Sequence, residues 1–208
     1  SVAAVAALLP PSTKAFVAQV AALQLLGLHL GRVRGSISDA DHREALAELQ
    51  AVPEKLATVI ATSKEKIEQL AHWMADTQSV LFLGRHVGFP VALEGALKLK
   101  ELAYIHAEGF AAGELKHGPI ALIDEDMPVV VIAPYDRVFE KTVSNMQEVA
   151  ARGGRIILVT DPQGARDRVL QHLVGPADGS PAPRHRGRVR PHRLHEVGKV
   201  AHVRPRRH

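Results

Sequence analysis

Hydrophobic and polar positions divide the chain into a helical first part and a second part in which strands and helices alternate. Residues 12 to about 30 are apolar on nearly every side of a helix, which predicts a buried helix. After a connection rich in Gly and Arg, further helices are predicted over about 40–50, from Pro53 onward, and over 63–76. The first part is therefore expected to be helical throughout.

The second part contains three short runs that are apolar apart from their end residues: SVLFLG at 79–84, PVVVIAP at 128–134 and RIILVT at 155–160. Such runs are typical of strands that are buried on both faces of a parallel sheet. Helical patterns lie between them, over 90–104 and 136–152. Strands and helices that alternate with short connections predict an α/β fold, a doubly wound parallel sheet sandwiched by helices.

The composition changes near residue 175. Residues 176–208 hold nine Lys or Arg and two Asp or Glu, a net charge of +7, whereas the whole chain has a net charge of +4. Proline and histidine are frequent there and large apolar residues are scarce, so we expect a basic tail without ordered structure. The tail has no aromatic residue on which a base could stack, so we expect no nucleic-acid partner.

Several classes of protein and site are excluded or disfavoured. The absence of cysteine excludes a disulfide scaffold, a thiolate metal site and a thiol nucleophile. No run reaches the ~18–20 consecutive apolar residues of a membrane span, and the apolar start of the chain lacks the basic segment of a signal peptide. The histidines follow no metal-ligand spacing. We therefore expect a cytoplasmic protein without a metal.

The loop after the first predicted strand is one candidate for chemistry. It runs from Gly84 to Gly88, and its glycines would let backbone N–H groups approach an anion while Arg85 adds charge. Its spacing matches neither a dinucleotide fingerprint nor a P-loop, so no cofactor is expected. A turn that needs small residues accounts for the glycines equally well.

Three charged residues on the next predicted helix are a sharper candidate. Glu94, Lys98 and Glu101 recur at spacings of four and three, which places them on one helical face. A solvated ion pair worth ~0.3–0.5 kcal/mol is the simpler interpretation. However, the helix is otherwise apolar, and a polar, glycine-rich stretch with His106 and His117 follows it. Such a set suits proton transfer, although a lone histidine more often has a structural role.

The run from Phe82 to Pro134 resembles the isomerase part of the glucosamine-6-phosphate synthase family, the glutamine:fructose-6-phosphate amidotransferases. The similarity includes the strings ALEGALKLKE, YIHAE and AAGELKHGP, and a fainter similarity extends back to STKAF and forward to about Asp161. The isomerase part of this family has two sugar-isomerase (SIS) subdomains. The resemblance implies a remnant of the first subdomain at 1–35, linker helices at 36–77, the second subdomain at 78–175 and the tail at 176–208.

The resemblance also implies roles for five residues. Glu101 matches the carboxylate that moves a proton between C1 and C2 of the sugar, with Lys98 and Glu94 as its charged neighbours. His117 matches the histidine that opens the sugar ring, which in this family comes from the partner subunit of a homodimer. Ser12 matches a serine near the sugar phosphate. The implied substrate and product are fructose-6-phosphate and glucosamine-6-phosphate.

Other functional parts of the family find no match in this sequence. These are the Ser/Thr-rich phosphate loop, the glutaminase cysteine and the C-terminal Schiff-base lysine. We therefore expect an incomplete isomerase portion with weak or no activity by itself. The alternative is a non-catalytic SIS protein that binds a phosphosugar and regulates another process. A protein that only binds would not require the charged helical face together with the histidine.

Overall fold

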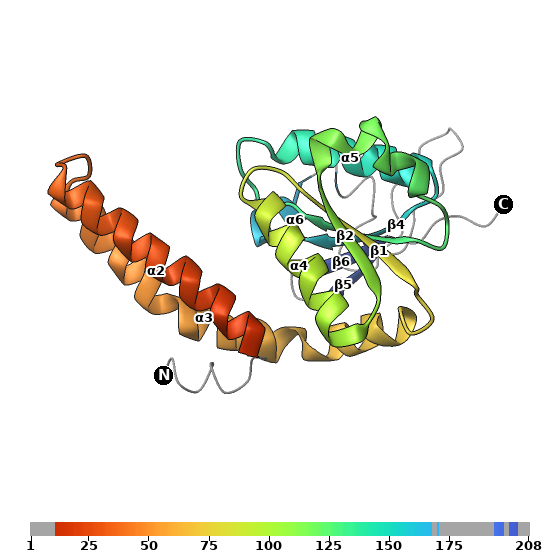
Figure 1. Cartoon of the computed structure of the whole chain (residues 1–208), viewed down its shortest axis with the longest axis horizontal. Helices are drawn as coiled ribbons and strands as arrows, with labels where there is room; N and C mark the ends of the chain where they lie inside the picture. The colour runs from red at the N-terminus through yellow and green to blue at the C-terminus, as the bar shows by residue number, and fades with distance from the viewer. Residues whose placement is uncertain (1–10, 168–169, 171–193, 198–199, 204–208) are drawn as a thin grey trace. The chain divides into compact units, whose positions relative to one another are not determined.

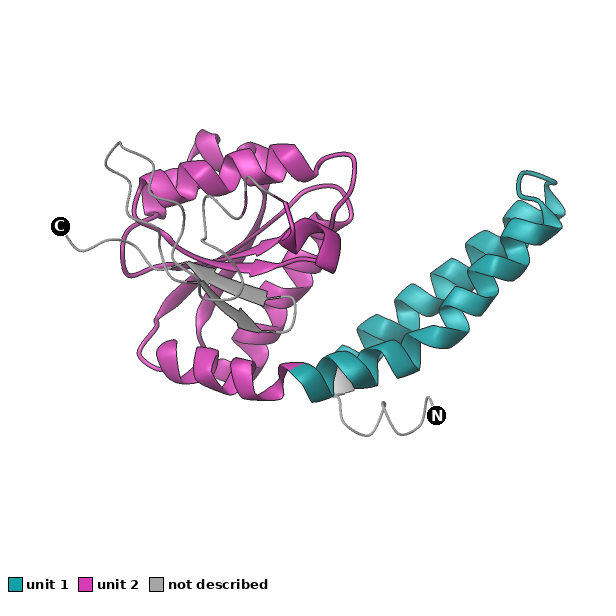
Figure 2. Ribbon diagram, turned by 180° about the vertical axis from the view of Figure 1, so that it is seen from behind, with its two compact units in different colours: residues 1–62 teal, residues 63–208 magenta. Residues whose placement is uncertain are grey.

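The computed structural model describes residues 11–167, 170, 194–197 and 200–203 (Figure 1). The chain divides into two compact units, residues 1–62 and residues 63–208 (Figure 2). Unit 1 is a hairpin of two helices, α2 (Pro11–Val33) and the first part of α3 (Asp39–Trp73). Ser38 caps the N-terminus of α3: its Oγ accepts a hydrogen bond from the backbone N–H of Asp41 at 3.1 Å.

Helix α3 is longer than the sequence predicts. Separate helices were expected on either side of Pro53, but the structure places Pro53 inside one continuous helix of 35 residues. The proline removes a single N–H donor. Leu49, Val52 and Leu56 continue the apolar spacing across it, and all three are half-buried. The shared apolar face therefore outweighs both the lost hydrogen bond and the crowding of the preceding turn by the proline ring.

Helix α2 is not buried, contrary to the prediction. Leu28 is buried, but Val20, Leu23 and Leu26 are at least half exposed. A hairpin of two helices covers only one face of each, so an all-round apolar helix keeps exposed apolar surface. By length and composition Thr13–Val33 could also cross a membrane, a property shared by core helices of soluble proteins and by signal sequences.

Unit 2 is built on a sheet with the strand order β2-β1-β3-β4-β6-β5 (Figure 1). The first four of these strands are parallel, and β5 and β6 are antiparallel. The alternating strands and helices confirm the predicted α/β fold. The elements are β1 (Ser79–Gly84), α4 (Gly88–Ala103), β2 (His106–Ala111), η1 (Ala112–His117), η2 (Pro119–Leu122), β3 (Pro128–Ile132), α5 (Phe139–Ala151), β4 (Arg155–Val159), α6 (Pro162–Ala165), β5 (Leu194–Val197) and β6 (Val200–Val203).

The two faces of the sheet are covered by different helices. From β1, Leu81 and Leu83 belong to the core cluster that contains the buried side chains of α5. Val80 and Phe82 belong to the cluster on the other face, with the buried alanines of α4. Burying an aliphatic side chain stabilises the fold by ~1.5–3 kcal/mol. Burial on both faces explains why the central residues of β1, β3 and β4 are all apolar, and it confirms the predicted sandwich.

Both edges of the sheet differ from the prediction. At one edge, His106–Ala111 form β2, although the sequence around them suggested a polar loop. At the other edge, 194–197 and 200–203 pair as an antiparallel hairpin on β4, although 176–208 was expected to lack ordered structure. An edge strand is held mainly by its backbone hydrogen bonds and tolerates polar side chains, so apolar patterning does not reveal it. The remainder of the predicted tail lies outside the described residues.

Candidate functional site

The charged residues of α4 form one connected group. The Nζ of Lys98 lies 2.6 Å from Oε2 of Glu101 and 3.4 Å from Oε1 of Glu94. The face that carries them is opposite the face of Ala92 and Ala96, which pack against the sheet. The Lys98 side chain is only 16% exposed, whereas that of Glu101 is 40% exposed. The group therefore offers an accessible carboxylate backed by a partly buried ammonium.

The electrostatics keep Lys98 positively charged. Its hydrogen bond to Glu101 is the main cause that raises the pKa of Lys98 above its ordinary value of 10.5; partial burial opposes the shift, and Glu94 adds to it. At neutral pH the Glu101 carboxylate thus has a permanent cation beside it. A carboxylate in this setting can take up a proton and return it to another atom of a bound molecule.

The Lys98 titration can be predicted from these contacts. Glu101→Gln removes the main stabilising partner of the ammonium, so we expect the pKa of Lys98 to fall, measured from the ¹⁵N shift of Nζ. Because the folded-state pKa is raised, this ion pair has its full stabilising effect from neutral pH up to 10.5 and loses it as pH rises through the raised value. Glu94→Gln should lower the pKa less. If the pKa of Lys98 fell further in Glu94→Gln than in Glu101→Gln, Glu101 would not be the main partner of the ammonium.

The loop after β1 is a tight turn, and the structure does not favour an anion cradle there. The Nε and Nη2 of Arg85 donate hydrogen bonds to Oδ1 of Asn145 on α5, at 3.0 and 2.9 Å. The guanidinium is thus already engaged inside the protein. A Cβ on Gly84 would overlap the carbonyl oxygen of Gly88, so the turn into α4 requires a glycine there. This is the small-residue turn that the sequence left open.

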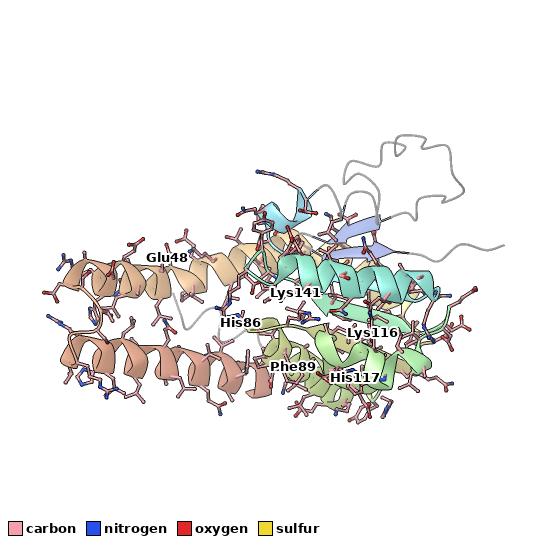
Figure 3. All side chains as sticks on the ribbon, turned by 90° about the horizontal axis from the view of Figure 1, so that it is seen from above. Glu48, His86, Phe89, Lys116, His117 and Lys141 are labelled. Atoms are coloured by element: carbon pink, nitrogen blue, oxygen red, sulfur yellow. The ribbon has the colours of Figure 1, made fainter. Side chains whose placement is uncertain are left out.

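His117 lies at the end of η1, directly after Lys116 (Figure 3). Its Nδ1 is 2.7 Å from Oε2 of Glu114, and both side chains are well exposed. Leu115 of the same segment is fully buried in the core cluster of α5. His117 therefore belongs to the α5 face of the sheet, at the edge where the parallel strands end.

The structure does not bring Glu101 and His117 of one chain together. Helix α4 begins at the carboxyl edge of the sheet, after β1, and runs back toward the amino edge. Glu101 lies 13 residues beyond its first residue, about 20 Å along the helix axis at 1.5 Å per residue. Helix α4 and η1 also pack on opposite faces. The two groups therefore lie toward opposite edges and on opposite faces.

The other two polar candidates contribute less to this geometry. Ser12 lies in the first turn of α2, where the structure describes its backbone and not its side chain. Its place near a sugar phosphate therefore stays a prediction. His106 begins β2 and is exposed, with its Nε2 3.5 Å from Oε1 of Glu108. Among the described residues, no group of three or more His, Asp or Glu side chains could hold a metal ion.

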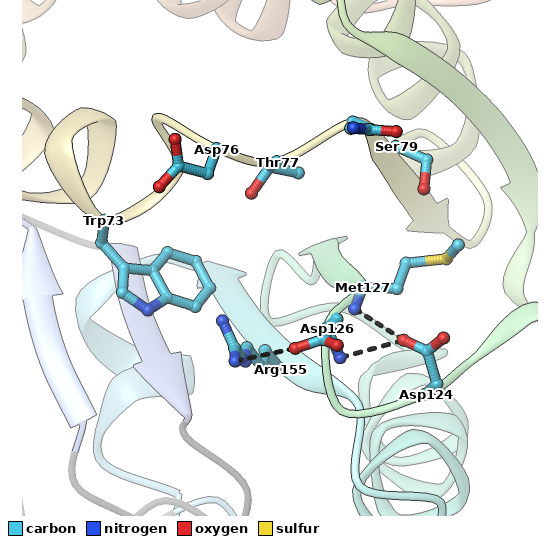
Figure 4. A pocket seen from close by; sticks show the side chains of 9 residues that line it. Trp73, Asp76, Thr77, Ser79, Asp124, Asp126, Met127 and Arg155 are labelled. Atoms are coloured by element: carbon cyan, nitrogen blue, oxygen red, sulfur yellow. Dashed lines mark hydrogen bonds and ion pairs between the residues drawn. The ribbon is translucent and has the colours of Figure 1, made fainter.

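A polar cavity of about 460 Å³ lies at the amino edge of the sheet, and it contains none of the candidate residues (Figure 4). Arg155 lies over the ring of Trp73, 5.3 Å from its centroid, and 3.3 Å from Oδ1 of Asp126. The Oδ1 of Asp124 accepts hydrogen bonds from the backbone N–H groups of Asp126 and Met127. Several of the polar groups that line this cavity thus already have hydrogen-bond or ion-pair partners within the protein.

Sequence reasoning missed one set of contacts around η1. Asn145 donates from Nδ2 to Oε2 of Glu148 at 3.4 Å, and Oε1 of Glu148 lies 3.0 Å from Nζ of Lys116. Together with Arg85, these residues link the β1 loop, α5 and η1. Arg85 and Asn145 are 60 positions apart, so periodicity contains no signal of the contact.

Comparison with known proteins agrees with this description. A family model for the SIS domain matches residues 74–166. The chain is 66% identical over 154 residues to a glutamine–fructose-6-phosphate aminotransferase (isomerizing) from Leifsonia xyli, and 60% identical over 163 residues to one from Bradyrhizobium diazoefficiens. These matches cover 72% and 78% of this chain but only 25% and 27% of the relatives. The chain thus spans about a quarter of their length.

Solved structures show the same relationship. The C-terminal domain of glucosamine-fructose-6-phosphate aminotransferase from Francisella tularensis matches with a TM-score of 0.70 and 42% identity, over 73% of this chain and 42% of that one. A Salmonella typhimurium structure described as a sugar-binding protein matches with a TM-score of 0.59 and 20% identity, over 73% and 46%, which shows the fold alone. Residues 74–166 therefore match the SIS domain, and the chain is similar to the C-terminal part of glutamine–fructose-6-phosphate aminotransferases.

Proposed function

We propose that this chain is the phosphosugar-binding isomerase portion of a glutamine–fructose-6-phosphate aminotransferase. Its substrate is fructose-6-phosphate and its product glucosamine-6-phosphate, in the cytoplasmic synthesis of amino sugars. The observation that carries the proposal is the contact of Lys98 with both Glu101 and Glu94 on an outward face of α4. The identity of 66% to an aminotransferase across this region supports the assignment.

The proposed chemistry is a proton transfer between neighbouring carbons. The 2-keto sugar first condenses with ammonia and loses water, which gives a 2-imino sugar. Conversion of the 2-imino sugar into its isomer, the 2-amino aldose, then requires a proton to leave C1 and a proton to reach C2. One carboxylate can do both in turn, and Glu101 is the exposed carboxylate of the group. Lys98 keeps a positive charge beside it, and Glu94 holds Lys98 from the other side. General acid–base catalysis of this kind contributes ~10²–10⁴-fold in rate.

Ring opening would fall to His117 of a second copy. A single chain holds Glu101 and His117 toward opposite edges and on opposite faces of the sheet, so one copy does not assemble both groups. The His117 side chain is 71% exposed, which leaves it accessible to another molecule. A homodimer that seats η1 of one subunit against α4 of the other would unite the two groups. In this proposal Ser12 lies near the sugar phosphate.

The test places the chain within a whole enzyme, because the chain spans about a quarter of the length of its relatives. The 154 matching residues of this chain would replace their counterpart in the Leifsonia xyli enzyme. We expect the chimera to form glucosamine-6-phosphate from fructose-6-phosphate and glutamine, detected by mass spectrometry. The 208-residue chain alone should form no product. Positioning of the sugar supplies ~7–11 kcal/mol of the barrier reduction, and it requires groups other than those that transfer the proton.

The alternative function makes a different prediction for the same chimera. If the chain is a non-catalytic SIS protein that binds a phosphosugar and regulates another process, the chimera would melt cooperatively and bind fructose-6-phosphate without forming product. That result would overturn the proposed isomerase function. The pairing of Lys98 with two carboxylates favours the catalytic function. A site that only binds a neutral ring and a phosphate does not require such a pairing.

A further inference from the structure

We propose that Arg85, Asn145 and Glu148 form a positioning network that holds η1 in place and thereby presents His117. The inference rests on the proposed function of His117, but the network itself is defined by contacts within this chain. It gives Arg85 a role different from the anion contact that the sequence suggested. Arg85 acts on the site through η1 and does not touch the sugar.

The first half of the network joins the β1 loop to α5. Both Nε and Nη2 of Arg85 donate to the same oxygen, Oδ1 of Asn145, at 3.0 and 2.9 Å. Asn145 is only 6% exposed. A buried amide oxygen that loses its donors is costly, so this contact is strongly favoured in the folded state. Two donors on one acceptor also fix the orientation of the guanidinium plane.

The second half reaches η1 at two points. The guanidinium lies against Gly113, where an added Cβ would be 3.2 Å from Nη1 of Arg85. Glu148 accepts from Nδ2 of Asn145 at 3.4 Å and contacts Nζ of Lys116 at 3.0 Å. The network thus meets η1 near its start, at Gly113, and near its end, at Lys116, immediately before His117.

η1 needs such external support. It is a 3₁₀-helix of six residues, and helices this short gain little from their own hydrogen bonds. Its C-terminal boundary is Gly118, whose φ of +142° is a backbone conformation open mainly to glycine. Leu115 anchors the middle of η1 in the core. The network adds a contact on each side of that anchor, which fixes the direction in which His117 points.

The test uses the full 208-residue chain and two measurements that need no substrate. Hydrogen exchange by mass spectrometry reports the order of residues 112–117, and ¹⁵N NMR of the His117 ring reports which nitrogen carries the proton while Nδ1 contacts Glu114. The variants are Arg85→Met, Arg85→Lys and Asn145→Asp. Asn145→Asp keeps an acceptor for Arg85 but replaces the donor to Glu148 by a repelling carboxylate. Arg166→Met is the matched control, since Arg166 is exposed at the end of α6.

We expect Arg85→Met to speed exchange in 112–117 by about tenfold or more while β1, β3 and β4 stay protected, and to change the His117 ring signals. Arg85→Lys should restore part of the protection, and Arg166→Met should leave both measurements unchanged. If Arg85→Met unfolds the whole chain, the Asn145→Asp variant provides the test of the network. It should speed hydrogen exchange in residues 112–117 and leave the rest of the chain protected. Unchanged exchange and ring signals at η1 in folded Asn145→Asp or Arg85→Met would overturn the network. The chimera assay judges the isomerase function separately.

Discussion

Glu101→Gln in the chimeric enzyme should lower kcat for glucosamine-6-phosphate formation by about 10²–10⁴-fold, with little change in KM. Glutamine keeps the size of the side chain and can still accept a hydrogen bond from Lys98. It cannot, however, take a proton from carbon and return it. Because the lost interaction acts on the chemical step and not on the bound sugar, the effect belongs in kcat. Product formation by mass spectrometry over a range of fructose-6-phosphate concentrations measures both constants.

The matched control is Glu140→Gln, which makes the same change at an exposed position of α5. This variant should retain the activity of the unmodified chimera. If Glu101→Gln and Glu140→Gln have the same activity, Glu101 does not transfer the proton. If Glu101→Gln raises KM and leaves kcat unchanged, its carboxylate binds the sugar without entering the reaction.

A companion variant separates proton transfer from ring opening. His117→Gln should lower kcat on fructose-6-phosphate, which is cyclic in solution. It should have little effect, relative to the unmodified chimera, on 5-deoxyfructose-6-phosphate, which lacks the hydroxyl that closes the ring. Glu101→Gln should impair the reaction of both compounds. If His117→Gln lowered kcat equally for both compounds, His117 would serve a step other than ring opening.

Gly84→Ala should lower the free energy of unfolding of the 208-residue chain by about 3 kcal/mol or more. The new Cβ would overlap the carbonyl oxygen of Gly88 and lie 2.7 Å from the backbone nitrogen of Phe89. Both atoms belong to the first turn of α4, so the clash has no flexible side chain to relieve it. Either β1 or the start of α4 must shift, although both are packed in the core. Denaturant unfolding followed by circular dichroism measures the loss.

Gly27→Ala is the control for this substitution. Gly27 lies inside α2, and a Cβ there meets no atom within 4 Å. Alanine has the higher helix propensity, so the control should be neutral or stabilise the chain by up to about 1 kcal/mol. If Gly84→Ala were as stable as Gly27→Ala, the turn between β1 and α4 would be looser than the structure shows, and the glycine would have no steric role.

Much of the fold of unit 2 was predictable because its determinants are local. The strands β1, β3 and β4 are buried on both faces, and burial on both faces leaves an uninterrupted apolar run. The grouping of Glu94, Lys98 and Glu101 was predictable for a similar reason. Residues three and four positions apart share one face of any helix, so the group needs only α4 to exist.

Elements whose stability comes from distant parts of the chain were not predictable in this way. The polar strand β2 forms because it pairs with β1, and the apolar pattern that marks a two-sided strand is absent from it. α3 continues through Pro53 because its apolar face persists, which outweighs a local helix-breaking signal. α2 is exposed because a two-helix hairpin has too little surface to cover an apolar helix.

The sequence by itself determined which residues could carry proton transfer, because residue type and helical spacing decide that locally. Only the tertiary structure decided which of them meet. Strand order and the direction of α4 place Glu101 and His117 of one chain toward opposite edges and on opposite faces of the sheet, although just 16 positions separate them. The same packing joins Arg85 to Asn145 across 60 positions. Both the separation of the first pair and the contact of the second depend on how the layers of the fold stack in space. No local sequence pattern contains that information.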